Sequence, residues 1–166
     1  MEPQGARRVF DGQLIKVDVE LWPAGEREVV HHPGACAIVA FTPEGEVVLV
    51  RQIREAVRQE LLEIPAGILD VEGEDGATCA ARELLEETGY RALNIERLAT
   101  IYTTPGFTDE RIELFRADAE PTDDGGEEAV EVVTLPLGRV FEAIEKGDIL
   151  DAKTVIGLLF IAGRGA

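Results

Sequence analysis

The chain has 166 residues, 45% of them hydrophobic, which is enough for one domain with a sizeable core. It carries 33 acidic against 16 basic residues, and the net charge of −17 argues against sequence-independent binding to nucleic acid or to an anionic membrane surface. Because no apolar stretch follows Met1 and the apolar run at residues 155–162 is too short to span a bilayer, we expect a cytoplasmic protein.

The N-terminal part has the pattern of a small antiparallel arm. Apolar and charged residues alternate at 15–21, which predicts a strand, and a turn at 23–25 returns the chain over 27–30. We expect residues 1–33 to form this arm and residues 34–166 to form the main domain.

The main domain mixes strands with a few helices. Strands are predicted near residues 35–41, 47–50, 61–64, 95–103, 112–117 and 130–135. Helices are predicted at 76–88, 137–146 and 152–161. This order favours an α/β (α+β) fold with a mixed sheet between helical layers.

The cysteines and histidines carry no recognisable motif. Cys36 and Cys79 lack C-x-x-C spacing, so free thiols in a reducing compartment are expected, with Cys36 in the core. His31 and His32 are adjacent and would point to opposite faces of a strand, so we interpret them as structural or surface residues.

Three carboxylates crowd the C-terminal half of the helix predicted at 76–88. Glu83, Glu86 and Glu87 lie within an arc of roughly 100° on its surface. Like charges at this spacing repel one another, and the helix macrodipole disfavours negative charge at this end. A divalent cation would reverse these effects, and hard cations such as Mg²⁺ prefer carboxylate oxygens. The alternative is that the three carboxylates form a solvated acidic face of the helix that binds no metal.

The residues around these carboxylates fit the same helix. Asp75 is a good N-cap and Gly89 suits a left-handed C-terminal cap. Arg82 lies at i, i+4 from Glu86, where it either forms a surface ion pair or holds that carboxylate in the orientation of a metal ligand.

The carboxylates belong to a longer pattern that resembles the signature of the Nudix hydrolases, G-x5-E-x7-R-E-U-x-E-E-x-G-U. The matching residues are Gly67, Glu74, Arg82, Glu83, Leu84, Glu86, Glu87, Gly89 and Tyr90. From Glu74 onward the spacing agrees at every defined position, but six residues rather than five separate Gly67 from Glu74. The extra residue lies in a loop-like segment, so we expect it to leave the carboxylate face unchanged.

The resemblance implies a Nudix-like α/β/α sandwich and a set of site residues. Glu83, Glu86 and Glu87 would bind Mg²⁺, with Mn²⁺ able to substitute, and the backbone carbonyl of Ala66 would be an additional ligand. A glutamate in the acidic segment at 118–131 would activate the attacking water. We prefer Glu128 over Glu127, although the sequence does not fix the register.

Other residues indicate a branch of the family. Pro105, 16 positions after Gly89, resembles the ADP-ribose pyrophosphatase branch, as does the string that continues through Gly106 and Phe107. Arg51 and Arg54 are candidates for binding the diphosphate or are exposed charges at a sheet edge.

The resemblance therefore predicts Mg²⁺-dependent hydrolysis of ADP-ribose to AMP and ribose 5-phosphate. It also implies a homodimer in which residues 1–33 pack on the partner. The alternatives are another nucleoside diphosphate sugar or dinucleotide as substrate, a domain that senses ADP-ribose without cleaving it, and a non-enzymatic acidic scaffold. An intact glutamate set argues against the sensing domain.

Overall fold

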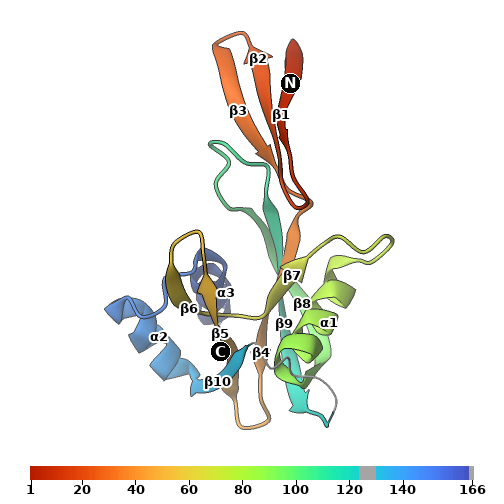
Figure 1. Cartoon of the computed structure of the whole chain (residues 1–166). Helices are drawn as coiled ribbons and strands as arrows, with labels where there is room; N and C mark the ends of the chain where they lie inside the picture. Colours follow the sequence, from red (N-terminus) through yellow and green to blue (C-terminus); the bar gives the residue numbers. More distant parts are fainter. Residues whose placement is uncertain (124–129, 165–166) are drawn as a thin grey trace.

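The computed structural model describes residues 1–123 and 130–164 and contains two sheets. The smaller is the predicted arm, an antiparallel sheet in the order β1-β2-β3, which projects from the body of the molecule (Figure 1). Its strands are β1 (Gly5–Asp11), β2 (Lys16–Trp22) and β3 (Gly25–His31). No residue of β1 is buried within the chain.

The larger sheet forms the centre of the body and is mixed, because β4 and β9 are parallel while their other neighbours are antiparallel. Its strand order is β10-β5-β4-β9-β8, with β6 paired to β5 and β7 paired to β4. The strands are β4 (Ala35–Phe41), β5 (Glu46–Arg54), β6 (Gln59–Glu63), β7 (Ala66–Ile68), β8 (Tyr90–Tyr102), β9 (Arg111–Pro121) and β10 (Glu131–Pro136).

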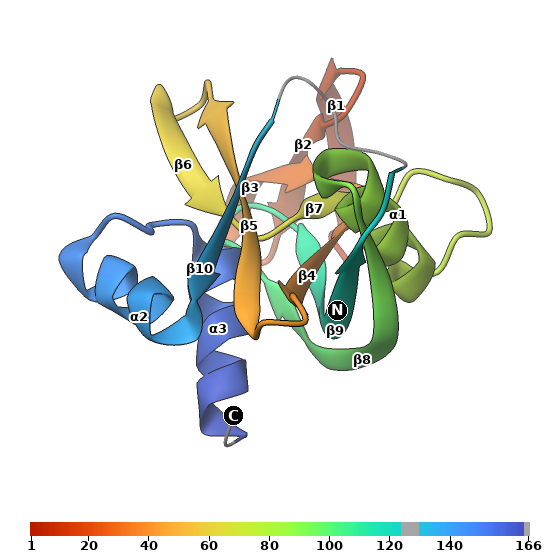
Figure 2. The same ribbon diagram turned by 90° about the horizontal axis from the view of Figure 1, so that it is seen from below.

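Helices cover both faces of this sheet (Figure 2). One core cluster joins the sheet to α2 (Leu137–Lys146) and α3 (Ala152–Gly163), and the other joins it to α1 (Gly76–Thr88). The predicted sandwich of a mixed sheet between helical layers is confirmed. Within the described ranges, no helix combines the length and apolar character needed to cross a membrane.

The strands β4 and β5 diverge, and this divergence positions the site. They pair only at Ala40–Val48 and Phe41–Val47, next to the turn that joins them. Farther along, β4 pairs with β7 instead, and the Ile38 N–H donates to the Pro65 carbonyl over 3.0 Å. The connection between β6 and β7 therefore enters the body, where β7 packs against α1.

The structure adds two strands that the sequence pattern did not predict. The strand β1 has adjacent apolar residues, Val9 and Phe10, rather than alternation, and a register irregularity lies between Arg8 and Phe10. The strand β7 is only three residues long, which is too short for a periodic pattern.

The expectation of free thiols is wrong, because Cys36 and Cys79 form a disulfide. Cys36 lies on β4 and Cys79 on α1, both fully buried in one core cluster with Cα atoms 6.4 Å apart. Packing of α1 on the sheet brings together residues that are 43 positions apart, which spacing alone does not reveal.

Candidate active site

The helix α1 has the predicted bounds because both ends are capped by their own residues. The Asp75 side chain accepts a hydrogen bond from the Thr78 N–H over 2.8 Å, and this bond lowers the pKa of Asp75. Gly89 ends the helix at φ 72°, with its N–H donating to the Leu85 carbonyl. The two caps fix the register of the acidic face.

Arg82 organises that face by bonding three carboxylates. Its Nε and Nη2 donate to the two oxygens of Glu74, each over 3.0 Å. Its Nη1 donates to Glu83 Oε1 over 2.6 Å and to Glu86 Oε2 over 2.9 Å. The predicted Arg82–Glu86 contact is therefore present, and Glu74 is joined to the helix through the same guanidinium. Hydrogen bonding to Arg82 also lowers the pKa of Glu74.

The third helical carboxylate, Glu87, faces the β6–β7 connection. The Ala66 N–H donates to Glu87 Oε2 over 3.3 Å. Burial raises the pKa of Glu87 to about 7, a shift that the Ala66 N–H opposes and the charge of Glu83 reinforces. Burial likewise raises the pKa of Glu83. Both carboxylates are thus held where their charged forms are disfavoured.

Gly67 is required by the approach of Glu83. A Cβ atom at position 67 would overlap the Glu83 carboxyl group, so a side chain there would displace a predicted metal ligand. Beyond Gly67, residues 70–73 are exposed, and the chain re-enters the site at Glu74. The additional residue of the motif therefore falls in a segment whose two ends are anchored by Glu83 and Arg82.

The acidic face has the donor chemistry of a hard-cation site, although within residues 1–123 and 130–164 no three His, Cys, Asp or Glu residues are arranged to hold a metal ion. Two of the carboxylates are hydrogen-bonded to Arg82 instead. Three carboxylates beside a backbone segment fit the oxygen ligands of Mg²⁺ or Mn²⁺, and a cation would offset the burial of Glu83 and Glu87. The metal role of Ala66, Glu83, Glu86 and Glu87 stays a prediction.

The predicted residue Arg54 belongs to a second group of charges beside Glu87, whose other members were not predicted from the sequence. Arg54 Nε and Nη2 donate to the two oxygens of Glu63 over 2.8 and 2.6 Å. Lys153, near the start of α3, donates to the same Glu63 and lies 3.1 Å from Asp151. One signal was available: a lysine in the first turn of an apolar helix, where the macrodipole disfavours a cation, needs a carboxylate partner.

The other predicted substrate-binding residues lie in two different places. Arg51 forms ion pairs of 3.4 Å with Glu60 and Glu131 on the neighbouring strands, so it does not join the pair formed by Arg54. Pro105, Gly106 and Phe107 lie in the β8–β9 loop and line a pocket of about 470 Å³ between this loop and the arm. The arm contributes Glu20, Trp22, Arg27, Glu28 and Val29 to that pocket.

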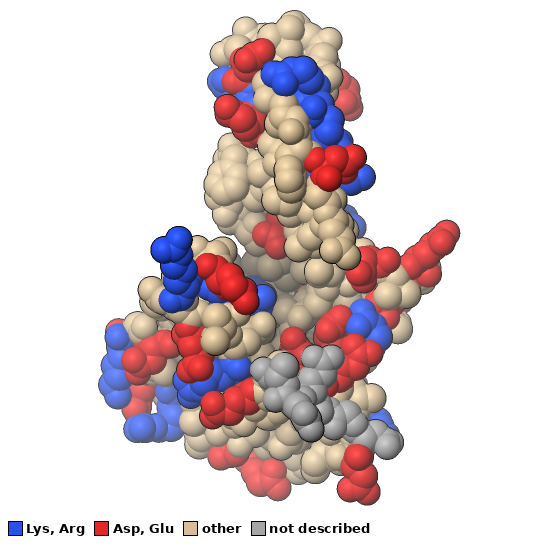
Figure 3. Space-filling model, in the orientation of Figure 1, with Lys and Arg blue, Asp and Glu red and all other residues tan. Residues whose placement is uncertain are grey.

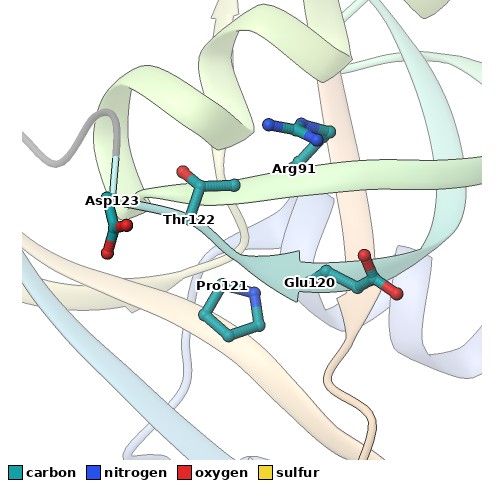
Figure 4. A pocket seen from close by; sticks show the side chains of 5 residues that line it. All are labelled: Arg91, Glu120, Pro121, Thr122 and Asp123. Carbon is teal, nitrogen blue, oxygen red and sulfur yellow. The ribbon is translucent and has the colours of Figure 1, made fainter.

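The predicted bases, Glu127 and Glu128, lie outside the described residues. A pocket of about 430 Å³ is lined by Arg91, Glu120, Pro121, Thr122 and Asp123. Figure 4 shows that these side chains point in different directions instead of converging. Among the described residues, no predicted site residue lines this pocket.

His31 connects the arm to the body. Its Nδ1 lies 2.6 Å from Asp109 Oδ2 and its Nε2 lies 3.2 Å from Asp18 Oδ2. The Val30 N–H donates to the Phe107 carbonyl over 2.8 Å in the same region. These contacts support the structural interpretation of this histidine.

The surface is consistent with the net charge. On the face shown in Figure 3, acidic side chains lie next to basic ones over both the arm and the body. This face therefore offers an anion local cations and not an extended basic surface.

Comparison with known proteins identifies the family. The model of the NUDIX domain matches residues 30–155, which include the acidic helix, the β6–β7 connection and the β8–β9 loop. The chain belongs to the Nudix family of hydrolases, whose members generally use divalent metal ions. At this level, the prediction of a Nudix pyrophosphohydrolase is confirmed.

Relatives with several named activities are similar over most of the chain. An ADP-ribose pyrophosphatase of Bacillus subtilis (strain 168) is 37% identical over 93% of this chain and 88% of its own length. A methanol dehydrogenase activator of Bacillus methanolicus is 39% identical over the same shares of the two chains. A GDP-mannose pyrophosphatase of Cronobacter sakazakii is 34% identical over 93% of this chain and 83% of its own.

A solved structure supports the fold. The crystal structure of an ADP compounds hydrolase superposes with a TM-score of 0.81, covering 99% of this chain and 97% of that one, at 22% identity. The likeness extends over the arm as well as the body.

Proposed function

We propose that this chain hydrolyses the diphosphate linkage of ADP-ribose to AMP and ribose 5-phosphate, using Mg²⁺, for which Mn²⁺ can substitute. The observation that carries the proposal is the acidic face of α1, where Arg82 joins Glu74, Glu83 and Glu86 while Glu87 accepts from Ala66. The similarity to ADP-ribose pyrophosphatases supports the choice of substrate.

Glu83, Glu86 and Glu87, with the backbone carbonyl of Ala66, would hold the metal. When bound, divalent cations neutralise charge on a diphosphate and lower the pKa of water. Arg82 and Glu74 orient two of the carboxylates through the hydrogen bonds described above, and Gly67 leaves room for Glu83. Other side chains would bind the substrate and accept the proton of the attacking water.

Arg54 is the proposed diphosphate contact, since its guanidinium is partly exposed beside the carboxylate helix, and Arg51 is a second, more distant candidate. Pro105, Gly106 and Phe107 would contact the nucleoside part. Glu128 would accept the proton of the attacking water, with Glu127 as the alternative. A positioned base contributes about 10²–10⁴-fold in rate, so Glu128→Gln should reduce kcat by that amount.

A homodimer formed through the arm is part of the proposal. Val17, Val19 and Leu21 alternate along β2, Ile15 precedes the strand, and none of these four residues is buried within the chain. A small sheet with an uncovered apolar face is marginally stable in water, which supports burial against a partner subunit. We also propose a cytoplasmic location, where nucleoside diphosphate compounds and Mg²⁺ are present.

A second candidate function is hydrolysis of another nucleoside diphosphate sugar, supported by the similarity to GDP-mannose pyrophosphatases. A domain that binds ADP-ribose without cleaving it is the non-catalytic alternative, and the complete glutamate set speaks against it.

The experiment that tests the proposal is a panel of nucleoside diphosphate compounds incubated with Mg²⁺, with the products identified by mass spectrometry. We expect the highest kcat/KM for ADP-ribose, with AMP as a product. A higher value for GDP-mannose would favour the second candidate, and binding without turnover would favour the sensing domain. Glu127→Gln and Glu128→Gln variants would then identify the base.

A further inference from the structure

The charges around Glu63 form the most deeply buried ionic cluster described in the body. The Glu63 side chain is 1% exposed and the Lys153 side chain 8% exposed, whereas Arg54 remains 41% exposed. Glu63 accepts from both cations, and Lys153 also contacts Asp151. The cluster thus runs from the start of α3 to the surface next to Glu87.

Stability alone is a poor explanation for this cluster. Burying an ion pair costs desolvation energy that the attraction repays only in part, and apolar residues of similar volume often serve as well. Lys153 is also placed in the first turn of α3, where the macrodipole disfavours a cation. A function for the charges accounts for their position better.

The geometry of Arg54 indicates what that function is. Both Nε and Nη2 are committed to the two oxygens of Glu63, and this bidentate pairing fixes the plane of the guanidinium. In the part of the chain that the structure describes, Nη1 makes no hydrogen bond, so it is available to a ligand. The segment that follows Glu63 links the cluster to the carboxylate helix, because the Ile64 N–H donates to Thr154 Oγ1 on α3 over 2.9 Å and the Ala66 N–H donates to Glu87.

The second cation on Glu63 has a distinct consequence. A carboxylate that is shared with Lys153 neutralises Arg54 less completely than a carboxylate paired with Arg54 alone. Asp151 does not cancel this effect in full, because it also accepts from the N–H and hydroxyl of Thr154 at the N-terminus of α3. Arg54 therefore retains positive charge toward solvent.

We propose that Glu63 and Lys153 are positioning residues for the substrate: Glu63 orients Arg54 toward the diphosphate, and Lys153, by sharing Glu63, leaves the positive charge of Arg54 less fully compensated. This inference rests on the proposed function for the identity of the substrate. It requires only that the bound group be an anion of the diphosphate class.

Steady-state kinetics and pyrophosphate binding test the inference with Lys153→Met, Lys153→Arg, Glu63→Gln and Arg54→Lys. Charge-assisted hydrogen bonds contribute enough that we expect Lys153→Met to raise KM on the order of tenfold while kcat changes by less than about threefold. Lys153→Arg should recover most of the loss, because it restores the charge. Val140→Ala, a buried change on α2 without any charge, is the control for lost stability and should leave KM unchanged.

A double-mutant cycle identifies the route of the effect. If Glu63 acts through Arg54, the variant Glu63→Gln/Arg54→Lys should bind no worse than the weaker single variant. Additive losses in KM would contradict action through Arg54. Wild-type KM in both Lys153→Met and Glu63→Gln, with only the thermal midpoint lowered, would overturn the inference and leave a purely structural ion pair.

Titration with inorganic pyrophosphate separates this inference from the proposed function. If the wild-type chain cleaves none of the nucleoside diphosphates, the proposed function fails, but calorimetric binding of pyrophosphate still reports on Arg54. Weaker binding in Glu63→Gln and Lys153→Met, with no change in Val140→Ala, would uphold the positioning role. Equal dissociation constants in all four proteins would overturn it.

Discussion

The acidic helix and the N-terminal arm differ in how much each depends on the rest of the chain. Asp75 and Gly89 cap the helix, and its residues Cys79 and Leu84 pack into the core. On its charged face, Arg82 donates a hydrogen bond to Glu74. The arm is an exposed sheet that meets the body through the β3 end, at Val30 and His31. The helix is therefore held by contacts within the body, whereas the arm leaves apolar side chains exposed.

The largest effect is expected for a substitution that inactivates the site in the body and leaves the arm unchanged. Glu86→Gln should lower kcat/KM on the order of 100-fold or more, because it removes a predicted metal-binding charge at nearly constant size. The thermal midpoint without metal should stay equal or rise, since repulsion with Glu83 is relieved. Activity is followed by product formation in Mg²⁺, and stability by circular dichroism.

Glu142→Gln is the matched control for that variant. Glu142 is 49% exposed against 48% for Glu86, and it also pairs with a cation at i, i+4, here Lys146. Near-wild-type activity for Glu86→Gln and Glu142→Gln alike would remove Glu86 from the ligand set.

The next effect concerns the arm alone. Deleting residues 1–33 should leave a folded body but give a monomer or an aggregate, with ADP-ribose binding at least about tenfold weaker, because the pocket between the arm and the β8–β9 loop loses one wall. Light scattering measures the oligomeric state. A full-length chain that is monomeric at micromolar concentration would rule out the shared-site dimer.

A point variant avoids the damage of truncation. Leu21 is 47% exposed on β2, so Leu21→Asp should weaken the dimer while the arm keeps its strands. Leu150→Asp, a similar change at a residue that is 62% exposed outside the arm, should have no effect on assembly. Equal assembly of both variants would place the interface elsewhere.

The next prediction concerns how much the disulfide between Cys36 and Cys79 contributes to the stability of the body. This disulfide closes a loop of 43 residues, for which chain entropy gives about 4 kcal/mol, and measured values are typically 2–4 kcal/mol. Adding reductant should lower the free energy of unfolding in guanidinium by about this amount. A Cys36→Ala/Cys79→Ala variant should be insensitive to reductant, so an equal response of the two proteins would contradict the assignment.

The smallest effect is the response to acid, which both regions share. Burial alone would raise the pKa of Glu63, but hydrogen bonds from Arg54 and the charge of Lys153 outweigh it and leave the pKa below its ordinary value. In the arm, the hydrogen bond from Arg8 lowers the pKa of Asp18. Each group therefore contributes stability above its unfolded pKa of about 4, and that contribution is lost as the pH falls through the lowered folded value.

Glu63→Gln should accordingly be destabilised most at neutral pH, with the difference from wild type narrowing toward pH 3. Asp18→Asn should show the same trend with a smaller amplitude, because the Asp18 side chain is 12% exposed against 1% for Glu63. Guanidinium unfolding at a series of pH values measures both. A difference that stays constant with pH would contradict the ion-pair interpretation.

The sequence predicted most successfully those features that depend on residues close together along the chain. The bounds of α1 follow from Asp75 and Gly89, and the contact between Arg82 and Glu86 follows from helical spacing. The partner of Lys153 lies 90 positions away, and the disulfide joins residues 43 apart, so local patterns identify neither partner. The bidentate bond from Arg82 to Glu74 also depends on how the loop returns to the helix.

The loop at residues 70–73 shows how a motif relates to the site behind it. Gly67 is fixed by the close approach of Glu83, and Glu74 is fixed by Arg82, while the residues between them are exposed. Lengthening such a loop by one residue costs little conformational entropy. The number of residues between Gly67 and Glu74 can therefore vary in evolution without changing the active-site geometry. A motif search that requires a constant number would miss chains that have this geometry.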